Sequence, residues 1–168
     1  MNNLTKAKNS DKKQKTSQRP KKPILSKIKQ FKHNNKQPYE YLQHTADCKF
    51  KAYGKTIEEM FSNAALAMFN IIVDTTTVSP LVIKEINVCG DDEYQLLYNF
   101  LEQLLFLIDT ESFLLHSIVE LTIEGKVLHA KVYGDCKIED YETHGDIKAV
   151  TYNEMEVTDK YVQVVVDL

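Results

Sequence analysis

The sequence is poor in the residues that cross-link small secreted domains or mark common catalytic sites. Its three cysteines, Cys48, Cys89 and Cys136, are odd in number and widely spaced, and no two of them form a CxxC pair. This spacing argues against a disulfide framework and a zinc site, and it fits a reducing compartment best. The five glycines are scattered, with no GxGxxG and no P-loop, so the common phosphate-binding fingerprints are absent. No Ser, His and Asp residues can be ordered into a catalytic triad, which leaves no complete catalytic apparatus.

Long apolar runs are also lacking. The longest, residues 104–108, is far too short to cross a bilayer, which takes about 20 residues. The basic N-terminal region is not followed by the apolar stretch of a signal peptide. We therefore expect a soluble protein of the cytoplasm, the nucleus or both, with no membrane partner.

Acidic residues are almost missing from the first part of the chain. Residues 1–37 contain 12 Lys and Arg and one acid, a net charge of +11, whereas residues 38–168 contain nine bases and 23 acids, a net charge of −14. Residues 1–23 have almost nothing apolar to bury, so the entropy cost of ordering them would not be offset. The sequence predicts a disordered basic extension, residues 1–37, before a folded domain, residues 38–168.

The basic extension admits several functions. Its charge is compatible with nuclear import, with holding RNA through salt-sensitive phosphate contacts, or with a short partner helix. It is equally compatible with a solvated tail, or with a tail that folds back onto the acidic domain. The charge alone therefore does not establish RNA binding.

The domain contains two helical patterns among strand patterns. Thr56 followed by Glu59 forms a capping box that opens a helix ending near Asp74. The acids Asp91 and Asp92 favour a second helix start, for a helix over 93–108. That helix is apolar all round, so it is either covered on both sides or leaves a patch for a partner. Strand patterns occupy residues 39–42, 49–53, 80–88, 119–124, 128–133, 147–152 and 161–167.

These elements predict the fold class. Their order is β-β-α-β-α-β-β-β-β, and Gly125 and Lys126 form a plausible hairpin turn. We expect an α+β single domain in which two helices pack on one mixed, largely antiparallel sheet.

Two acidic positions predict a metal site. Asp167 and the main-chain carboxylate of Leu168 lie side by side at the end of the last strand pattern, and Asp47 lies between the first two strand patterns. Alternation places Asp167 on the face of Tyr161, Gln163 and Val165, and leaves the valines at 162, 164 and 166 to pack inward. If the segments meet, three hard oxygen donors converge, which suits Ca²⁺ or Mg²⁺.

Each of these residues also has an ordinary explanation. Asp47 alone is typical of a turn residue, and a polar residue at the end of a chain usually faces water. His44, three residues before Asp47, could orient that loop or be hydrogen-bonded locally. His144 could contact a partner or simply face solvent. The three anions together would repel one another without a cation, which is why the set as a whole points to a metal.

Several motifs resemble the archease family. They span the predicted domain and are, in order, His44-Thr-Ala-Asp47, residues 52–59, residues 63–69, Thr77-Val-Ser-Pro-Leu81, Gly90-Asp-Asp92, residues 100–105, Lys148-Ala-Val-Thr-Tyr152 and Val165-Val-Asp-Leu168. The resemblance implies a small protein that activates RtcB-family RNA ligases, the manganese- and GTP-dependent enzymes that seal tRNA exons. It implies that the protein promotes guanylylation of the ligase and its repeated turnover. It also implies that Asp47, Asp167 and Leu168 bind the metal.

The sequence thus predicts an activator of an RNA ligase rather than an enzyme. Its expected cofactor is a divalent cation, Ca²⁺, Mg²⁺ or Mn²⁺, and its expected partners are the ligase and, through the basic tail, tRNA. Two alternatives remain open at this point. One is a metal-dependent phosphohydrolase or nucleotidyl enzyme that acts alone, and the other is an RNA-tethering module that works through the tail.

Overall fold

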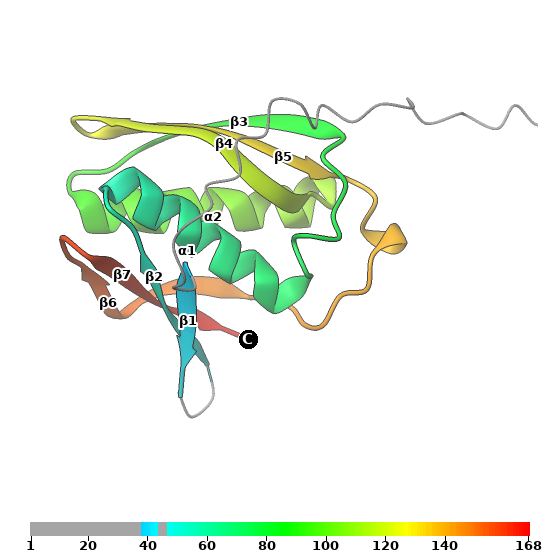
Figure 1. The fold of residues 1–168 in the computed structure, drawn as a ribbon, viewed down its shortest axis with the longest axis horizontal. Helices are drawn as coiled ribbons and strands as arrows, with labels where there is room; N and C mark the ends of the chain where they lie inside the picture. The colour runs from blue at the N-terminus through cyan, green and yellow to red at the C-terminus, as the bar shows by residue number, and fades with distance from the viewer. Residues whose placement is uncertain (1–37, 44–46) are drawn as a thin grey trace, which may run out of the picture.

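Two antiparallel sheets enclose two helices in the computed structural model, which describes residues 38–43 and 47–168 (Figure 1). The helices are α1 (Ile57–Ile72) and α2 (Glu93–Glu111), and η2 (Ile138–Asp140) is a 3₁₀ turn. The strands are β1 (Tyr39–Leu42), β2 (Cys48–Tyr53), β3 (Val82–Cys89), β4 (Leu114–Glu124), β5 (Val127–Asp135), β6 (Ala149–Val157) and β7 (Tyr161–Asp167). The basic extension predicted for residues 1–37 lies outside the described residues.

The predicted α+β class and element order are confirmed, while the strands are divided differently from the single sheet expected. One sheet has the order β1-β2-β7-β6 and the other β3-β5-β4. The neighbouring strands among the described residues all pair antiparallel. β3 and β4 do run in the same direction, but β5 lies between them, so the crossover through α2 creates no parallel pair.

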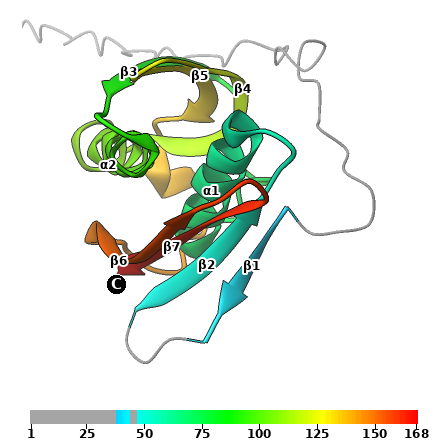
Figure 2. The same ribbon diagram turned by 90° about the vertical axis from the view of Figure 1, so that its left-hand side faces the viewer.

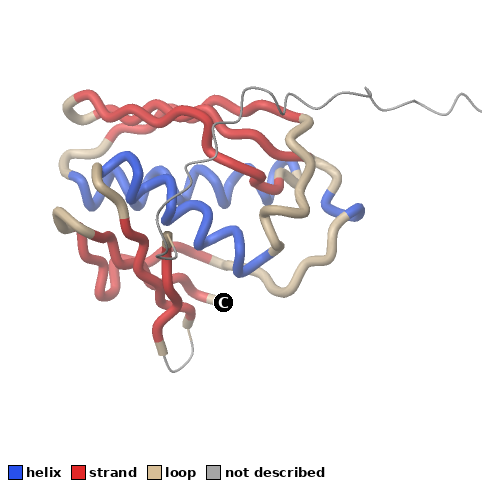
Figure 3. The backbone as a smooth tube through the Cα atoms, in the orientation of Figure 1, coloured by secondary structure: helices blue, strands red, loops and turns tan. Residues whose placement is uncertain are grey.

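The helices form the middle layer of the molecule (Figures 1 and 3). α1 contacts β2 and β7 on one side and β4 on the other, and α2 contacts β6 on one side and β3 on the other. Both helices therefore bury apolar side chains in two directions. This explains why α2 is apolar all round, with Leu97, Phe100, Leu101 and Leu104 fully buried. Strands therefore cover α2 on two sides, while a third side carries the exposed Tyr94 and Phe106.

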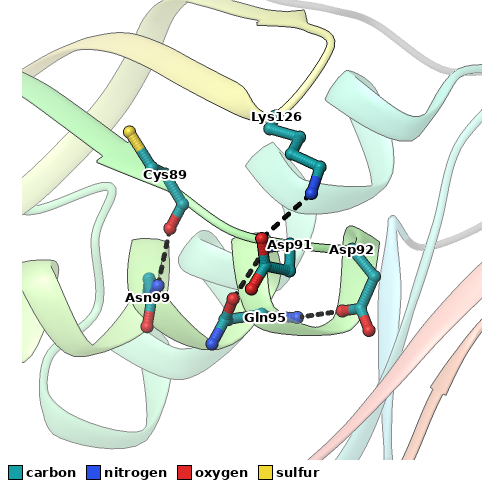
Figure 4. A network of polar contacts seen from close by, with 6 residues as sticks. All are labelled: Cys89, Asp91, Asp92, Gln95, Asn99 and Lys126. Atoms are coloured by element: carbon teal, nitrogen blue, oxygen red, sulfur yellow. Dashed lines mark hydrogen bonds and ion pairs between the residues drawn. The ribbon is translucent and has the colours of Figure 1, made fainter.

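Capping residues define where both helices begin. Thr56 Oγ1 accepts a hydrogen bond from the Glu59 amide at 3.2 Å, and the Glu59 carboxylate reaches back to the Lys55 amide at 2.6 Å. Asp92 caps α2 in the same way, accepting from the Gln95 amide at 2.8 Å (Figure 4). These bonds satisfy amides that have no partner inside the helix. The predicted starts of both helices are therefore correct.

The helix ends differ slightly from the prediction. α1 ends at Ile72 because Val73 is extended. The Asp74 side chain then accepts a hydrogen bond from the Thr76 amide at 2.9 Å, which forms a turn. α2 continues three residues beyond 108, to Glu111, and ends where Ser112 adopts a left-handed conformation with φ of 53°. Neither helix in the described part of the chain combines the length and apolarity needed to cross a membrane.

A hydrogen bond between a tyrosine hydroxyl and a carboxylate links the edge strand β1 to β2. We expect its contribution to stability to depend on pH. The Tyr53 hydroxyl donates to Glu40, and this bond, with a smaller effect of burial, raises the pKa of Tyr53 from 10.0 to about 12. Because the pKa is higher in the folded state, the contribution is complete below pH 10 and is lost as the pH rises from 10 to 12. Urea unfolding of the wild type and Tyr53→Phe should give a gap in unfolding free energy that closes over this range. A gap that persists unchanged above it would contradict this assignment.

Candidate functional site

The strand register brings Asp47 and Asp167 to the same end of one sheet. β2 and β7 pair antiparallel, and the last partners of this ladder are Cys48 and Val166. Asp47 immediately precedes Cys48 and Asp167 immediately follows Val166, so the two acids come next on adjacent strands, on the same face of the sheet. In both views the end of β7 lies beside the start of β2 (Figures 1 and 2). Asp167 is exposed and Asp47 is half-buried.

The inward face of β7 is the predicted one, and its outward face is more buried than expected. Val162, Val164 and Val166 are fully buried, but Gln163 and Val165 on the opposite face are buried as well. β7 lies between β2 and β6, and an ion pair links these neighbours, with Lys49 Nζ 2.5 Å from the Glu154 carboxylate. Gln163 Nε2 also donates to the Glu154 carbonyl at 2.7 Å. β7 is thus a central strand that is covered on both faces. Asp167, its last residue, is exposed.

A lysine holds the third predicted donor. Lys148 donates from its backbone amide to the Asp167 carbonyl at 2.9 Å and from Nζ to the main-chain oxygen of Leu168 at 2.5 Å. Sequence reasoning did not identify Lys148 as part of this cluster. The available signal was its place just before β6, whose Ala149 pairs with Asp167. The structure therefore adds one positive charge to the predicted set of anions.

The thiol next to Asp47 is not a ready metal ligand. Cys48 directly follows Asp47, so its side chain points to the opposite face of the sheet, where burial raises the pKa of its thiol above the usual value. The donors that remain at this end of the sheet are oxygens, which hard divalent cations prefer.

Of the two histidines predicted as supporting residues, only His144 lies within the described part of the chain. His44 falls outside the described residues. The His144 amide donates to the Ile72 carbonyl at 2.7 Å, which places His144 at the end of α1. There it contributes to lowering the pKa of Asp74, an effect due mainly to hydrogen bonds from Thr76. The described contacts of His144 therefore belong to the α1 terminus.

The donor set fits a cation held partly by the main chain. Within residues 38–43 and 47–168, no three His, Cys, Asp or Glu side chains gather closely enough to hold a metal ion. The predicted set differs from such clusters because only Asp47 and Asp167 are side-chain donors and the third is the carboxylate of Leu168. Two carboxylates on adjacent strands repel each other unless a positive charge lies between them, and oxygen donors of this kind suit Ca²⁺, Mg²⁺ or Mn²⁺.

Comparisons with known proteins agree on one family. A family model described as "Archease protein family (MTH1598/TM1083)" matches residues 39–168. The archease of Methanosarcina barkeri is 43% identical over 143 residues, covering 77% of this chain and 95% of the relative. The archease of Pyrococcus abyssi is 37% identical over 123 residues, covering 71% of this chain and 87% of the relative.

Two solved structures share the fold. The solution structure of protein 1598 from Methanobacterium thermoautotrophicum has a TM-score of 0.67 and 33% identity, and the match covers 78% of this chain and 99% of that one. The crystal structure of an archease from Thermotoga maritima has a TM-score of 0.51 and 20% identity, with 82% and 100% covered, and it supports the fold alone.

Proposed function

We propose that this chain, which belongs to the archease family, is a protein cofactor that activates an RtcB-family RNA ligase in tRNA splicing. It promotes guanylylation of the ligase and its multiple turnover. It acts as an activator and not as an enzyme, in keeping with a sequence in which no complete catalytic set can be ordered.

The register of β2 and β7 is the observation that best supports this proposal. It sets Asp47 and Asp167 at one end of the sheet, where they and the carboxylate of Leu168 would hold a divalent cation, Ca²⁺, Mg²⁺ or Mn²⁺. When bound, such a cation supplies positive charge to phosphate oxygens, the kind of stabilisation that guanylyl transfer needs. The chain's own residues would hold the carboxylate oxygens that bind the cation at an exposed end of the sheet, where a partner can reach them.

Lys148 has a supporting role in this proposal. Its Nζ bond fixes the main-chain oxygen of Leu168, and its amide bond fixes the backbone of Asp167. Residues that hold ligands in place are often as important as the ligands themselves. Lys148 would therefore keep the end of β7 in register with β6 while Asp47, Asp167 and the Leu168 carboxylate bind the cation.

The proposed partners are the ligase and, through the basic residues 1–37, its tRNA. A chain with 12 bases in this segment would contact phosphates in a salt-dependent way. The expected location is the cytoplasm, the nucleus or both. Because the tail lies outside the matched family region, its removal should leave stimulation of the ligase largely intact.

Single-turnover guanylylation of the cognate RtcB-type ligase tests the proposal. The full chain, added below the ligase concentration, should accelerate formation of guanylylated ligase and restore repeated turnover. A variant with one glycine added after Leu168 moves the terminal carboxylate while both aspartates stay in place, and it should stimulate less. If the chain leaves guanylylation unchanged, or hydrolyses GTP by itself with multiple turnover that is lost in Asp47→Ala, the activator function is wrong.

A further inference from the structure

One side of α2 is open to solvent and carries aromatic residues. Tyr94, Tyr98, Glu102 and Phe106 recur every four residues and so form one stripe along the helix. Phe106 is 57% exposed and Tyr94 is 41% exposed. Figure 2 shows α2 at the open side of the molecule, between β3 and β6, with α1 on its other side. β3 and β6 are each an edge strand of their sheet, and α2 contacts both of them.

The stripe continues onto β6 and into a groove. The ring of Tyr152 stacks on Tyr98 with centroids 4.4 Å apart and planes 7° from parallel, although Tyr152 is 52% exposed. Beside Phe106 lies an open groove of about 390 Å³, and its other lining residues are Val88, Cys89, Asn99, Glu102 and Gln103. Exposed aromatic side chains around a groove are typical of the energetic centre of a protein interface.

Hydrogen bonds hold this side of α2 rigidly against both edge strands. Asn99 Nδ2 donates to the Cys89 carbonyl of β3 at 2.7 Å (Figure 4), and Glu102 Oε1 accepts from the Val150 amide of β6 at 2.8 Å. The aromatic groups are therefore presented from a fixed helix rather than from a loop. A backbone that is already ordered loses less conformational entropy when a partner binds.

The charged residues of α2 itself are all acidic. α2 contains four acids, Glu93, Glu102, Asp109 and Glu111, and no Lys or Arg, and two more acids, Asp91 and Asp92, precede it. Ion pairs occur at the two ends of the helix, between Lys126 and Asp91 at 2.9 Å and between Lys84 and Glu111. The exposed Asp109, three residues after Phe106, adds negative charge on the side of the aromatic stripe. A partner that binds there must be basic and must bring apolar groups of its own.

We propose that this side of α2 docks onto a basic surface of the RNA ligase that also presents apolar groups. The docking surface consists of Tyr94, Tyr98 and Phe106 of α2, Tyr152 of β6, and the exposed acid Asp109. An enzyme that handles RNA needs positive surface potential around its substrate channel, and the acidic charge of α2 complements it. Complementary charge accelerates encounter, while the buried aromatic groups provide most of the affinity.

This inference rests on the proposed function and separates two roles within it. The docking surface lies on the open side of α2, whereas Asp47 and Asp167 lie where β2 begins and β7 ends. Docking and activation therefore depend on different residues. Substitutions in the docking surface change the ligase concentration needed for stimulation, and substitutions of the two aspartates change the stimulation reached at saturation.

Calorimetric titration of the full chain with the RtcB-type ligase tests the surface. The double variant Phe106→Ser/Tyr152→Ser should bind at least about tenfold more weakly, the loss expected when interface anchors are removed. Asp109→Lys should weaken binding and flatten its dependence on salt. The matched controls are Ile83→Ser, at an apolar residue on β3 that is 49% exposed, and Glu124→Lys at the β4–β5 turn. Both controls should bind like the wild type.

The outcomes separate the surface from the function. Wild-type affinity in both the aromatic and the charge variants would overturn the docking surface while leaving activation intact. Self-association of the wild type in sedimentation, lost in Phe106→Ser/Tyr152→Ser while ligase affinity is unchanged, would assign the surface to a second copy of this chain and overturn the proposal too. A wild type that binds the ligase but never stimulates it would overturn the proposed function and leave docking supported. Thermal unfolding of each variant confirms that it is folded.

Discussion

Replacing Asp47 or Asp167 by alanine should lower stimulation of ligase guanylylation by at least about 100-fold, the range in which removing one preorganised electrostatic group falls. In the proposed site each substitution removes one of the two side-chain carboxylates, and the affinity for a divalent cation falls with the number of charged ligands. The loss should appear in the maximal stimulation at saturating protein. Single-turnover guanylylation, measured across a range of protein concentrations, separates this effect from weaker binding.

The control for this pair lies in the turn just before β7. Asp159 is an exposed acid in the turn that leads into β7, at the end of β7 opposite Asp167. Asp159→Ala removes the same charge and should stimulate like the wild type. Since Asp167 is exposed, Asp167→Ala should unfold at nearly the wild-type temperature. Full stimulation by both Asp47→Ala and Asp167→Ala would show that the acidic pair has no part in activation.

Replacing Gly134 by alanine should destabilise the fold by about 3 kcal/mol or more, at the upper end of the cost of overpacking. A Cβ added to Gly134 would lie 2.0 Å from the Leu114 carbonyl oxygen and 2.6 Å from the ring of Phe113. Phe113 and Leu114 are fully buried, and the carbonyl belongs to the backbone of β4, so neither can move aside cheaply. Urea unfolding should show the loss as a lower midpoint with an unchanged slope.

Gly145 provides the matched substitution. A Cβ there would meet its nearest atom, the Ile71 carbonyl oxygen, at 4.0 Å, an ordinary contact distance. Gly145→Ala should therefore change the free energy of unfolding by less than about 1 kcal/mol. Equal stability of Gly134→Ala and Gly145→Ala would mean that β4 and β5 do not approach each other as closely as described.

The sequence predicted the elements whose signals are local. The capping box at Thr56 and the acid at Asp92 mark helix starts through hydrogen bonds within one turn, and the valines of β7 alternate as a strand should. The start of β4 was missed for a physical reason. It begins at Leu114, five residues before the predicted 119, and its register shifts at Leu115/Ser117 and at Ile118/Glu120. Such bulges interrupt the alternation on which strand prediction depends.

Long-range pairing was harder to predict. Nothing local to β3, β4 and β5 says that they form a sheet of their own on the far side of the helices, because each strand pattern reports only that one face is buried. The end of β6 was missed for a related reason. It runs to Val157, past a shift in register after Thr151 and past Glu154, whose φ is 48°.

The candidate site was predictable in part. Asp47 and Asp167 stood out because each adjoins a strand pattern, but only the β2–β7 register sets them at the same end of a sheet. Lys148 was not identified because its contact with Leu168 depends on the pairing of β6 with β7. The apolar pattern of α2 does not tell whether other elements cover the helix on both sides or a partner binds one side of it, because both cases give the same pattern in the sequence.

Calorimetric titration of the full chain with Mn²⁺ tests most directly whether the acidic pair holds a cation. We expect one site in the wild type and in Asp159→Ala, and loss of that site in both Asp47→Asn and Asp167→Asn, which keep the size of the side chain and remove its charge. Retention of the site with wild-type affinity in either asparagine variant would contradict the account.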